Sequence, residues 1–545
     1  MNPLVLSDLT ALIVDDQRPF QVMLKGILAS LGLLKVHFAN SGEQAMSRCN
    51  KIEFDVLFVD YNLGSGKNGR QLLQDLRERQ LLKASSIFII VTGENTVTMV
   101  MSAVELEPDD YLIKPFSQSL LKSRLQKLQQ KKQQLAALYQ AMFEQNHQQV
   151  VELCLAHMAE QGRYEQYCRR VLAERYLTLG DTDKLTEVLD LSLQQRRPAW
   201  ALNLLARLKL QQQDYASCQA ICQEVVETNR FCAQGYDILS QCQLAQAQTA
   251  EALLSLQQAI AIAPYHLPRQ YLLVDVARQA GQVQDMVQAS KQIFELTRRT
   301  NQQDVLHLLN YIRTLIDAID LTDEPAKRNR LQQETMIALN RHQKDEGLIG
   351  DLDFSRFEQL CMARIEAIEG RFQQIKKMLK PLQAYISAED EDVADLIMLL
   401  YKIGEFEQAE ALLTTIPSAQ LNDPVLYPML QQHQAKYQQA GQQLMNLNKD
   451  GIALYQQGKY QEAILVFEQA MQLAPSNSGA TLNLIQALLQ VLITQQKHKS
   501  LAIYQRCRQL FKGIEPSILP SQHQERYHDL QVQYQQIRQE LKQSS

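Results

Sequence analysis

A turn position recurs at a nearly constant interval in the middle of the chain, and this period restricts the fold more than any other sequence feature. The turns fall at Asn146, Gly180, Gln213, Ala247 and Gly281, at successive steps of 34, 33, 34 and 34 residues. The segments between them have helical hydrophobic spacing. A pattern that holds its phase over so many units predicts stacking, because each unit buries its apolar face against the next.

The clearest unit lies near the end of the chain and reads LNKDGIALYQQGKYQEAILVFEQAMQLAP. It combines small residues, a central turn and aromatic residues, at Gly451, Ala463, Ala470, Gly458, Tyr460 and Phe467. This spacing resembles the tetratricopeptide repeat (TPR), a helix-turn-helix unit of about 34 residues. Gly370 and Gly404, which are 34 residues apart, mark a second run. The resemblance implies an all-α TPR superhelix that binds a protein partner, although no partner-binding residue is evident within it.

We divide the helical part of the chain by these patterns. The expected regions are a TPR array of about five repeats (126–300), a helical insertion (301–350), a degenerate TPR or helical region (351–445), a C-terminal TPR with capping helices (446–520) and a polar terminal helix or tail (521–545). The stretch from Ser117 to Asn146 contains no Gly or Pro, so a continuous or closely coupled helix should join the array to the preceding domain.

Residues 1–125 have a different pattern, in which β-rich runs alternate with amphipathic helical segments. The runs are ALIVDD, KVHFAN, VLFVD, IFIIVTG and YLIKPF. Such alternation predicts a parallel sheet with helices on both faces, whose functional crevice lies at the carboxyl ends of the strands. Five polar residues follow or end these runs and are expected to converge: Asp15, Asp16, Asp60, Thr92 and Lys114.

The motifs VDD, FVD, VTG and KPF place these five residues in the order and spacing of a known family. Through them, Ala11 to Phe116 resembles the receiver domain of two-component response regulators. ANSGEQA resembles the second strand-to-helix turn of that family. The resemblance implies an α/β flavodoxin-like, doubly wound receiver with a five-stranded parallel sheet. In the family, a cis proline follows the lysine of KPF, which corresponds to Pro115 here.

The chemistry of the site explains these residue types. Three crowded carboxylates repel one another, and a hard divalent cation with oxygen ligands relieves the repulsion. The resemblance implies that Asp16, Asp60 and the backbone carbonyl of Asn62 hold Mg²⁺, with Asp15 acting largely through water. Asp60 would be the phosphoacceptor, and Lys114 would neutralise charge on the transferred group.

Four further assignments follow from the same resemblance. Thr92 would offer its hydroxyl to a phosphoryl oxygen, and Tyr111 matches the switch aromatic. Asn62 and Glu94 occupy the positions that tune hydrolysis, and their polar character implies rapid self-dephosphorylation. The sequence departs from the family at the loop before Gly69, which is one residue longer, and at Glu107, where the family usually has glycine.

The expected function is phosphorelay signal transduction by a cytoplasmic response regulator. Its partners would be a sensor histidine kinase or phosphotransfer protein and an unknown protein target of the TPR region. We expect no enzyme activity beyond Mg²⁺-dependent self-phosphorylation and self-dephosphorylation, because no catalytic set follows Leu120. A phosphorylation-independent scaffold and a TPR-type phosphatase or regulator of another receiver remain alternatives.

Composition limits the remaining partners. The net charge of −5 offers no general attraction to nucleic acid or anionic lipid, and the basic run from Lys122 to Lys132 is interpreted as a solvated helix face, so no DNA binding is expected. No signal peptide or membrane span is expected. Nine cysteines lack a CxxC pair, and Cys218 with Cys222 is interpreted as core filling rather than a metal site.

Overall fold

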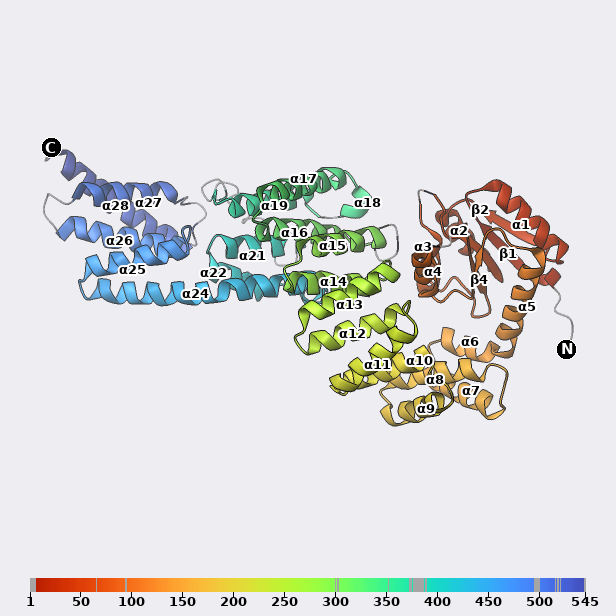
Figure 1. The fold of residues 1–545 in the computed structure, drawn as a ribbon. Helices are drawn as coiled ribbons and strands as arrows, with labels where there is room; N and C mark the ends of the chain where they lie inside the picture. The colour runs from red at the N-terminus through yellow and green to blue at the C-terminus, as the bar shows by residue number, and fades with distance from the viewer. Residues whose placement is uncertain are drawn as a thin grey trace. The chain divides into compact units, whose positions relative to one another are not determined.

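The computed structural model describes residues 6–64, 66–93, 96–298, 303–350, 352–371, 390–494, 500–514 and 521–543, together with residues 300, 375, 387, 516 and 519. The chain forms two compact units, Met1–Asp304 and Val305–Ser545, and each is considered by itself below (Figure 1). The first unit contains the α/β domain and the first helical repeats. The second unit is helical throughout its described residues.

A five-stranded parallel sheet forms the centre of the N-terminal domain, in the order β2-β1-β3-β4-β5. This arrangement confirms the fold that the alternating pattern predicts. Its register aligns Val14 with Ala39 and Val59, and Asp60 with Val91, so several strands end at one edge. The strands are β1 (Thr10–Val14), β2 (Lys35–Ala39), β3 (Val56–Asp60), β4 (Ile87–Thr92) and β5 (Asp110–Ile113).

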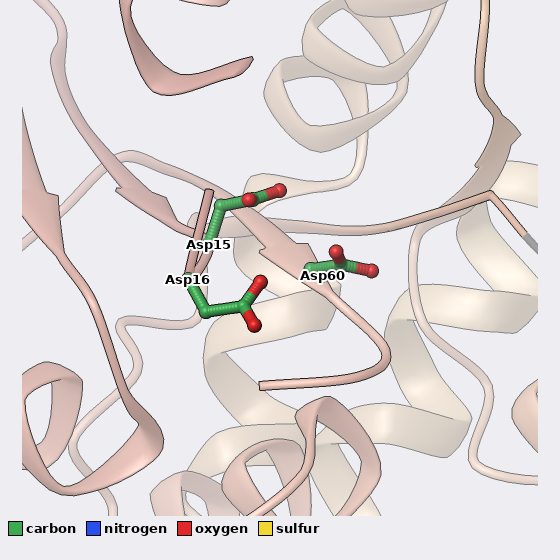
Figure 2. A group of neighbouring side chains, drawn as sticks. All are labelled: Asp15, Asp16 and Asp60. Carbon is green, nitrogen blue, oxygen red and sulfur yellow. The ribbon is translucent and has the colours of Figure 1, made fainter. Parts of the chain in front are cut away.

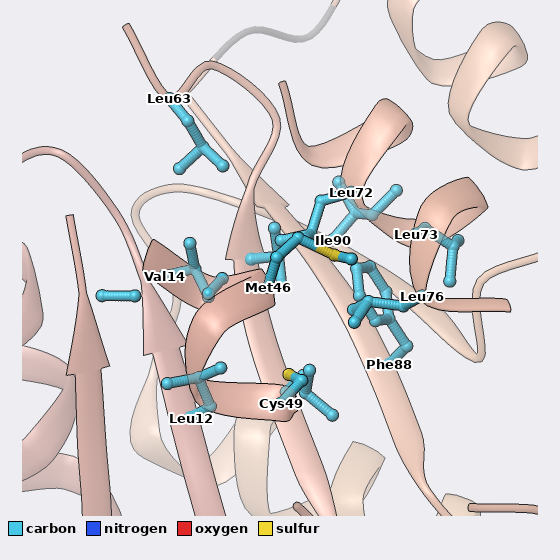
Figure 3. Packing of buried hydrophobic residues seen from close by; sticks show 14 of the residues in the cluster. Leu12, Val14, Met46, Cys49, Leu63, Leu72, Leu73, Leu76, Phe88 and Ile90 are labelled. Carbon is cyan, nitrogen blue, oxygen red and sulfur yellow. The ribbon is translucent and has the colours of Figure 1, made fainter. Parts of the chain in front are cut away.

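Helices cover both faces of the sheet because successive strand residues point to opposite sides. Leu24, Leu28, Leu121 and Leu125 bring α1 and α5 onto one face. On the opposite face, α2, α3 and α4 enclose a core that includes Met46, Leu72 and Phe88 (Figure 3). A short 3₁₀ helix (Leu6–Asp8) precedes β1, and the helices are α1 (Arg18–Ser30), α2 (Gly42–Cys49), α3 (Gly69–Glu78), α4 (Val97–Val104) and α5 (Gln118–Gln134).

The connection from α5 to the first repeat helix is closely coupled but not one continuous helix. Leu135 separates α5 from α6 (Ala136–Phe143) and has φ −106° and ψ 22°. The hydrogen-bonded path nevertheless continues, since the Leu135 amide donates to the Lys131 carbonyl and the Tyr139 amide donates to Leu135. Leu135 is buried in the first core of the repeats. Packing in that core therefore accounts for an interruption where the chain has neither Gly nor Pro.

The repeat turns confirm the predicted period at four positions and correct it at one. Gly180, Gln213, Ala247 and Gly281 all have positive φ, whereas the first such residue is Gln145 rather than Asn146. Asn146 instead caps α7, because its side chain accepts a hydrogen bond from the Gln149 amide. The remaining helices of this unit are α7 (His147–Ala159), α8 (Glu165–Leu179), α9 (Thr182–Gln195), α10 (Ala199–Gln211), α11 (Tyr215–Thr228), α12 (Ala233–Ala245), α13 (Thr249–Ile262), α14 (Leu267–Gln279) and α15 (Val283–Thr297).

Cys218 and Cys222 lie in an apolar core with Cys242, as the core-filling interpretation requires. Burial raises the pKa of Cys242 to about 11, which keeps its thiol protonated at neutral pH. These side chains therefore contribute apolar volume to the stacked repeats.

The second unit continues the helical pattern. Gly370, Gly404 and Gly458 have positive φ, which lets the chain turn after a helix with no strain from a side chain. The sequence-based boundary at residue 446 falls inside the long helix α24. The described helices are α16 (Val305–Leu321), α17 (Pro325–His342), α18 (Glu346–Ile349), α19 (Phe354–Ile368), α21 (Val393–Lys402), α22 (Phe406–Leu413), α23 (Ser418–Leu421), α24 (Leu426–Gln456), α25 (Tyr460–Leu473), α26 (Ser478–Thr494), α27 (Ser500–Gly513) and α28 (Ser521–Gln543).

The terminal segment is a helix with one buried face rather than a uniformly polar element. Tyr527, Leu530, Tyr534 and Ile537 of α28 pack in a core with residues of α26 and α27. Their spacing of three or four residues places them on one side of the helix. Within the part of the chain that the structure describes, no helix is long and apolar enough to span a membrane.

Buried ion pairs join α16, α19 and α21 in the second unit. Arg313 pairs with Asp395 at 2.8 Å, and Arg364 pairs with Asp395 at 2.6 Å and with Asp317 at 3.0 Å. Burial disfavours the charged form of Arg364, but these two carboxylates raise the pKa of its guanidinium above the usual value. Each charge thus depends on its partners, because an unpaired buried charge is strongly destabilising.

Two glycines of α24 provide a test of repeat packing. A Cβ at Gly451 would lie 2.4 Å from Cε1 of Phe467, whereas one at Gly441 would lie 3.5 Å from the nearest atoms of Phe406. We expect Gly451→Ala to destabilise the protein by about 1–3 kcal/mol through overpacking. Gly441→Ala should instead stabilise it by roughly 0.5–1 kcal/mol through helix propensity. Urea unfolding monitored by circular dichroism measures both, and equal midpoints for the two variants would contradict this packing.

Candidate functional site

Three carboxylates gather at the carboxyl end of the sheet. Asp15 follows β1, Asp16 follows it directly, and Asp60 is the last residue of β3. One oxygen from each carboxylate lies within 4.8 Å of the others (Figure 2). Asp15 and Asp60 are buried and Asp16 is exposed. The cluster therefore has a buried floor and one side open to solvent.

Lys114 supplies the opposing charge. Its Nζ lies 2.7 Å from Oδ2 of Asp15 and 2.8 Å from Oδ2 of Asp60. The ammonium also lies 3.9 Å from the centre of the Phe20 ring, which adds a cation–π contact. Lys114 comes from the segment after β5, and its peptide bond to Pro115 is cis, as the resemblance implies. Lys114 thus pairs with the carboxylate that follows β1 and with the one that ends β3.

The electrostatic balance at Asp60 favours a further cation. Burial raises the pKa of the Asp60 carboxyl, Lys114 lowers it, and the neighbouring Asp15 raises it again, with a net rise above the usual value. One ammonium faces three carboxylates, so negative charge remains in excess. Carboxylate oxygens are the ligands that Mg²⁺ prefers. The donor set of Asp15, Asp16 and Asp60 therefore fits a hard divalent cation.

Backbone groups orient the two buried carboxylates. The Gln17 amide donates to Oδ1 of Asp15 at 2.8 Å, and the Asn62 amide donates to Oδ1 of Asp60 at 3.4 Å. At Gly69, the first residue of α3, a Cβ would come within 2.4 Å of the Asp60 carbonyl oxygen. Only glycine allows α3 to begin this close to Asp60, which explains the residue at this position.

Gln21 is a structural component of the site that the sequence analysis does not identify. Its buried side chain donates to the carbonyl oxygen of Asp15 at 2.6 Å, to that of Ala39 at 3.1 Å and to Oδ1 of Asn40 at 2.8 Å. It joins the loops that follow β1 and β2. In the sequence, Gln21 is a polar residue next to the apolar Val22 and Met23, a pattern that places the glutamine at the surface. In the structure Gln21 is buried, whereas Val22 and Met23 are exposed. That reversal depends on tertiary packing.

The other predicted site residues lie around this cluster. Thr92 is buried at the end of β4, and its carbonyl accepts a hydrogen bond from the Lys114 amide at 2.7 Å. Tyr111 pairs with Ile90 in the sheet and packs against the core beneath α2, α3 and α4. Asn62 is exposed just after Asp60. Glu94 lies outside the described residues. The roles assigned to these residues remain predictions.

The loop between β3 and α3 is anchored at its far end. The Lys67 amide donates to Oε1 of Glu43 at 2.9 Å, and its ammonium pairs with the buried Asp75. Asn68 and Gln71 form a reciprocal capping box at the start of α3. The loop before Gly69 therefore ends at a well-capped helix.

Comparison with protein families identifies two regions. Residues 11–126 match the response regulator receiver domain, and residues 454–491 match the tetratricopeptide repeat. The second match includes α25 and most of α26. These findings agree with the architecture of an α/β receiver followed by helical repeats.

Two curated chemotaxis proteins each match about a quarter of this chain. Chemotaxis protein CheY of Pseudomonas aeruginosa is 30% identical over 117 residues, which cover 22% of this chain and 93% of that protein. Chemotaxis protein CheY-3 of Vibrio cholerae is 28% identical over 128 residues, covering 24% of this chain and 97% of that protein. Among solved structures, chemotaxis protein CheY4 of Vibrio cholerae is 24% identical, with 22% and 98% of the chains covered and a TM-score of 0.21.

The carboxylate cluster generates a prediction about metal affinity. Asp16→Asn removes one anionic ligand without disturbing the buried Asp15, so we expect Mg²⁺ or Mn²⁺ affinity to fall about tenfold or more, or at least ~1.4 kcal/mol. Electron paramagnetic resonance of Mn²⁺, with competition by Mg²⁺, measures the change. Asp8→Asn, at an exposed carboxylate outside the cluster, is the control. Equal affinities of the two variants would exclude Asp16 as a ligand.

Proposed function

The chain belongs to the response regulator receiver family through its N-terminal domain, and from this premise we propose that it carries a phosphorelay signal to a protein target of its TPR region. The observation that supports the proposal most directly is Asp60, set at the end of the central strand beside Lys114 and two further carboxylates. The phosphate would come from a sensor histidine kinase or a phosphotransfer protein.

In the proposed transfer, a carboxylate oxygen of Asp60 attacks the phosphorus of a phosphohistidine. A new oxygen–phosphorus bond forms as the phosphorus–nitrogen bond breaks, and the imidazole leaves with the bonding electrons and takes up a proton. A bound Mg²⁺, held by Asp16, Asp60 and the Asn62 carbonyl, would neutralise charge on the phosphoryl oxygens. Asp60 is buried, and its exposed neighbour Asp16 marks the open side of the site.

Lys114 and Thr92 have complementary roles in this proposal. The Lys114 ammonium, now shared by Asp15 and Asp60, is within reach of a phosphoryl oxygen on Asp60. Thr92 would donate its hydroxyl to another phosphoryl oxygen. Because the Lys114 amide donates to the Thr92 carbonyl, the backbones that carry these two groups are directly connected. Tyr111, one strand residue before Leu112, would follow the movement of Thr92 as the switch aromatic.

The output would be a change in protein binding rather than a reaction on another substrate. TPR units present stacked helical surfaces, and such surfaces commonly bind proteins. We therefore propose no enzymatic activity beyond self-phosphorylation and self-dephosphorylation. The test below also distinguishes the scaffold alternative, because a phosphorylation-independent scaffold would bind its target equally well with and without the phosphoryl group.

Phosphorylation of Asp60 is the first expectation. Incubation of the full chain with a small phosphodonor and Mg²⁺ should add one phosphoryl group, detectable by intact mass, and Asp60→Asn should abolish it because the amide is a poor nucleophile. The Asp8→Asn control should be labelled like the unmodified protein. Labelling of the Asp60→Asn variant at an unchanged level would refute the assignment. Affinity capture with both forms then identifies the phosphorylation-dependent target.

The lifetime of the phosphorylated form is a separate expectation. Polar residues at Asn62 and Glu94 would admit and orient a water molecule, so we expect self-dephosphorylation within minutes, since positioned acid–base chemistry contributes about 10² or more in rate. Asn62→Leu should lengthen the lifetime by excluding water. Loss of label followed after removal of the phosphodonor measures both. A phosphoryl group that persists for many hours in the unmodified chain would contradict the role of these positions.

A further inference from the structure

The receiver contacts its own repeats through a surface far from the α5–α6 connection. Within the first compact unit, α4 packs against α13, although more than a hundred residues separate these helices in the chain. Helix α3 contributes contacts from the same side of the domain, which faces α13 to α15 (Figure 1). The receiver therefore contacts the repeats at this second surface in addition to the covalent connection.

An ion cluster lies at the centre of the second surface. Arg269 of α14 donates through Nη2 to Oε1 of Glu105, the residue that caps α4, at 2.6 Å, and through Nε to Oδ1 of Asp237 in α12, at 2.7 Å. Only 1% of its side chain is exposed. Burial disfavours its charge, but hydrogen bonds to Asp237 and Glu105 raise the pKa of the guanidinium above its usual value. Glu105 therefore adds a carboxylate from the receiver to a buried arginine that already pairs with Asp237 of the repeats.

Contacts from α3 and α4 extend the surface on both sides of this cluster. Nη1 of Arg70 donates to the Tyr265 carbonyl at 3.1 Å, and Nε2 of Gln71 donates to the Leu296 carbonyl at 3.3 Å. The Thr98 hydroxyl donates to the Ala261 carbonyl at 3.4 Å. Met101 packs with a small apolar group of the repeats, formed by Ala233, Ile262, Ala263, Phe231 and Tyr236. The surface thus combines a charged centre, carbonyl acceptors and one apolar anchor.

Glu107 provides a separate sign that contact with the repeats has shaped the receiver, although its partner lies in α8 and not on the surface around Arg269. Its φ of +49° lies in the left-handed region, which favours glycine and disfavours a residue with a Cβ. Its side chain nevertheless forms an ion pair with Arg170 of α8. A glycine would suit the backbone but could not make this pair. The residue at this turn thus contacts the repeats at the expense of local backbone preference.

The composition of the surface suits reversible contact. If the receiver separated, Arg269 would retain Asp237 within the repeats, so its buried charge would keep a partner. Glu105 and Arg70 would gain water, and Met101 would leave the small apolar group of the repeats. Polar contacts with few apolar residues are typical of interfaces between domains that move relative to each other.

The two docking helices follow the two strands that end at Asp60 and Thr92. Gly69, the first residue of α3, lies against the Asp60 carbonyl and immediately precedes Arg70. Helix α4 starts at Val97, a few residues after Thr92, and ends next to Glu105. A change at Asp60 that shifts either helix would move Arg70 or Glu105 relative to the repeats.

We propose that the face of α12 to α15 around Arg269 is a docking surface for the chain's own receiver, which binds it in cis through Glu105, Arg70 and Met101. Its coupling to phosphorylation rests on the proposed function, whereas the docking itself does not. If both hold, docking and phosphorylation change each other's equilibrium by the same factor, because linkage is reciprocal. Binding of the receiver to the repeats would then change the affinity of the repeats for their external target.

Hydrogen exchange of the full chain tests the docking directly. Glu105→Lys places an ammonium against Arg269 and should increase exchange about tenfold or more both in α4 and at the start of α14. The β1 amides of Leu12 to Val14 should stay protected, which shows that the receiver remains folded. Glu144→Lys is the matched control, since it makes the same charge change at an exposed residue after α6.

Three outcomes overturn the proposal. Equal exchange in Glu105→Lys, Glu144→Lys and the unmodified chain would exclude docking through Glu105. Exposure of α4 without exposure of α14 would show that the variant disturbs the receiver alone. Protection that increases with protein concentration would mean contact between two copies, which contradicts docking in cis.

Beryllofluoride, a phosphoryl mimic, tests the coupling. We expect its affinity in the presence of Mg²⁺ to differ about fivefold or more between Thr98→Val or Glu105→Lys and the Glu144→Lys control, as is typical of linked sites. Altered exchange with unchanged affinity would overturn the coupling but not the docking. Failure of Asp60 labelling with altered exchange would overturn the proposed function alone.

Discussion

The placement of one ammonium between carboxylates from two strands is the interaction on which the receiver site depends. Lys114 approaches Asp15 and Asp60 at nearly equal distances, 2.7 Å and 2.8 Å, and so links the ends of β1, β3 and β5. A parallel sheet makes this possible because its strands all end at the same edge. Asp16 leaves the cluster with excess negative charge. This excess explains why a hard divalent cation is a suitable ligand of the site.

The helical repeats meet a different constraint, which is that no unit can bury its apolar face alone. Turn residues with positive φ, such as Gly180 and Gly281, bring each helix back against its neighbour. In the second unit the packed helices also enclose Arg313, Arg364 and Asp395, whose charges are paired across three helices. Such pairs restrict the register of the helices more than they add to stability, because desolvation offsets much of their attraction.

The second contact between receiver and repeats adds a second route for the proposed signal. A helical connection through Leu135 is one route, since backbone hydrogen bonds continue across it. The surface at Glu105 and Arg269 supplies another, and it joins α3 and α4, which follow the strands ending at Asp60 and Thr92, to α12, α13, α14 and α15. A two-state equilibrium at this surface would let a small displacement at the proposed phosphorylation site alter a large binding surface, provided that each ligand prefers one state.

Local sequence patterns determined the parallel receiver sheet, the repeat period and the set Asp15, Asp16, Asp60, Thr92 and Lys114, because alternation, turn residues and strand-end positions each act over a short stretch of chain. The same patterns could not reveal that Gln21 turns inward, that the helix is interrupted at Leu135, or that the first repeat turn is Gln145. Nor could they show Glu105 beside Arg269, 164 residues later. Those features depend on packing and charge pairing between distant segments, and only the tertiary structure decides which distant residues become neighbours.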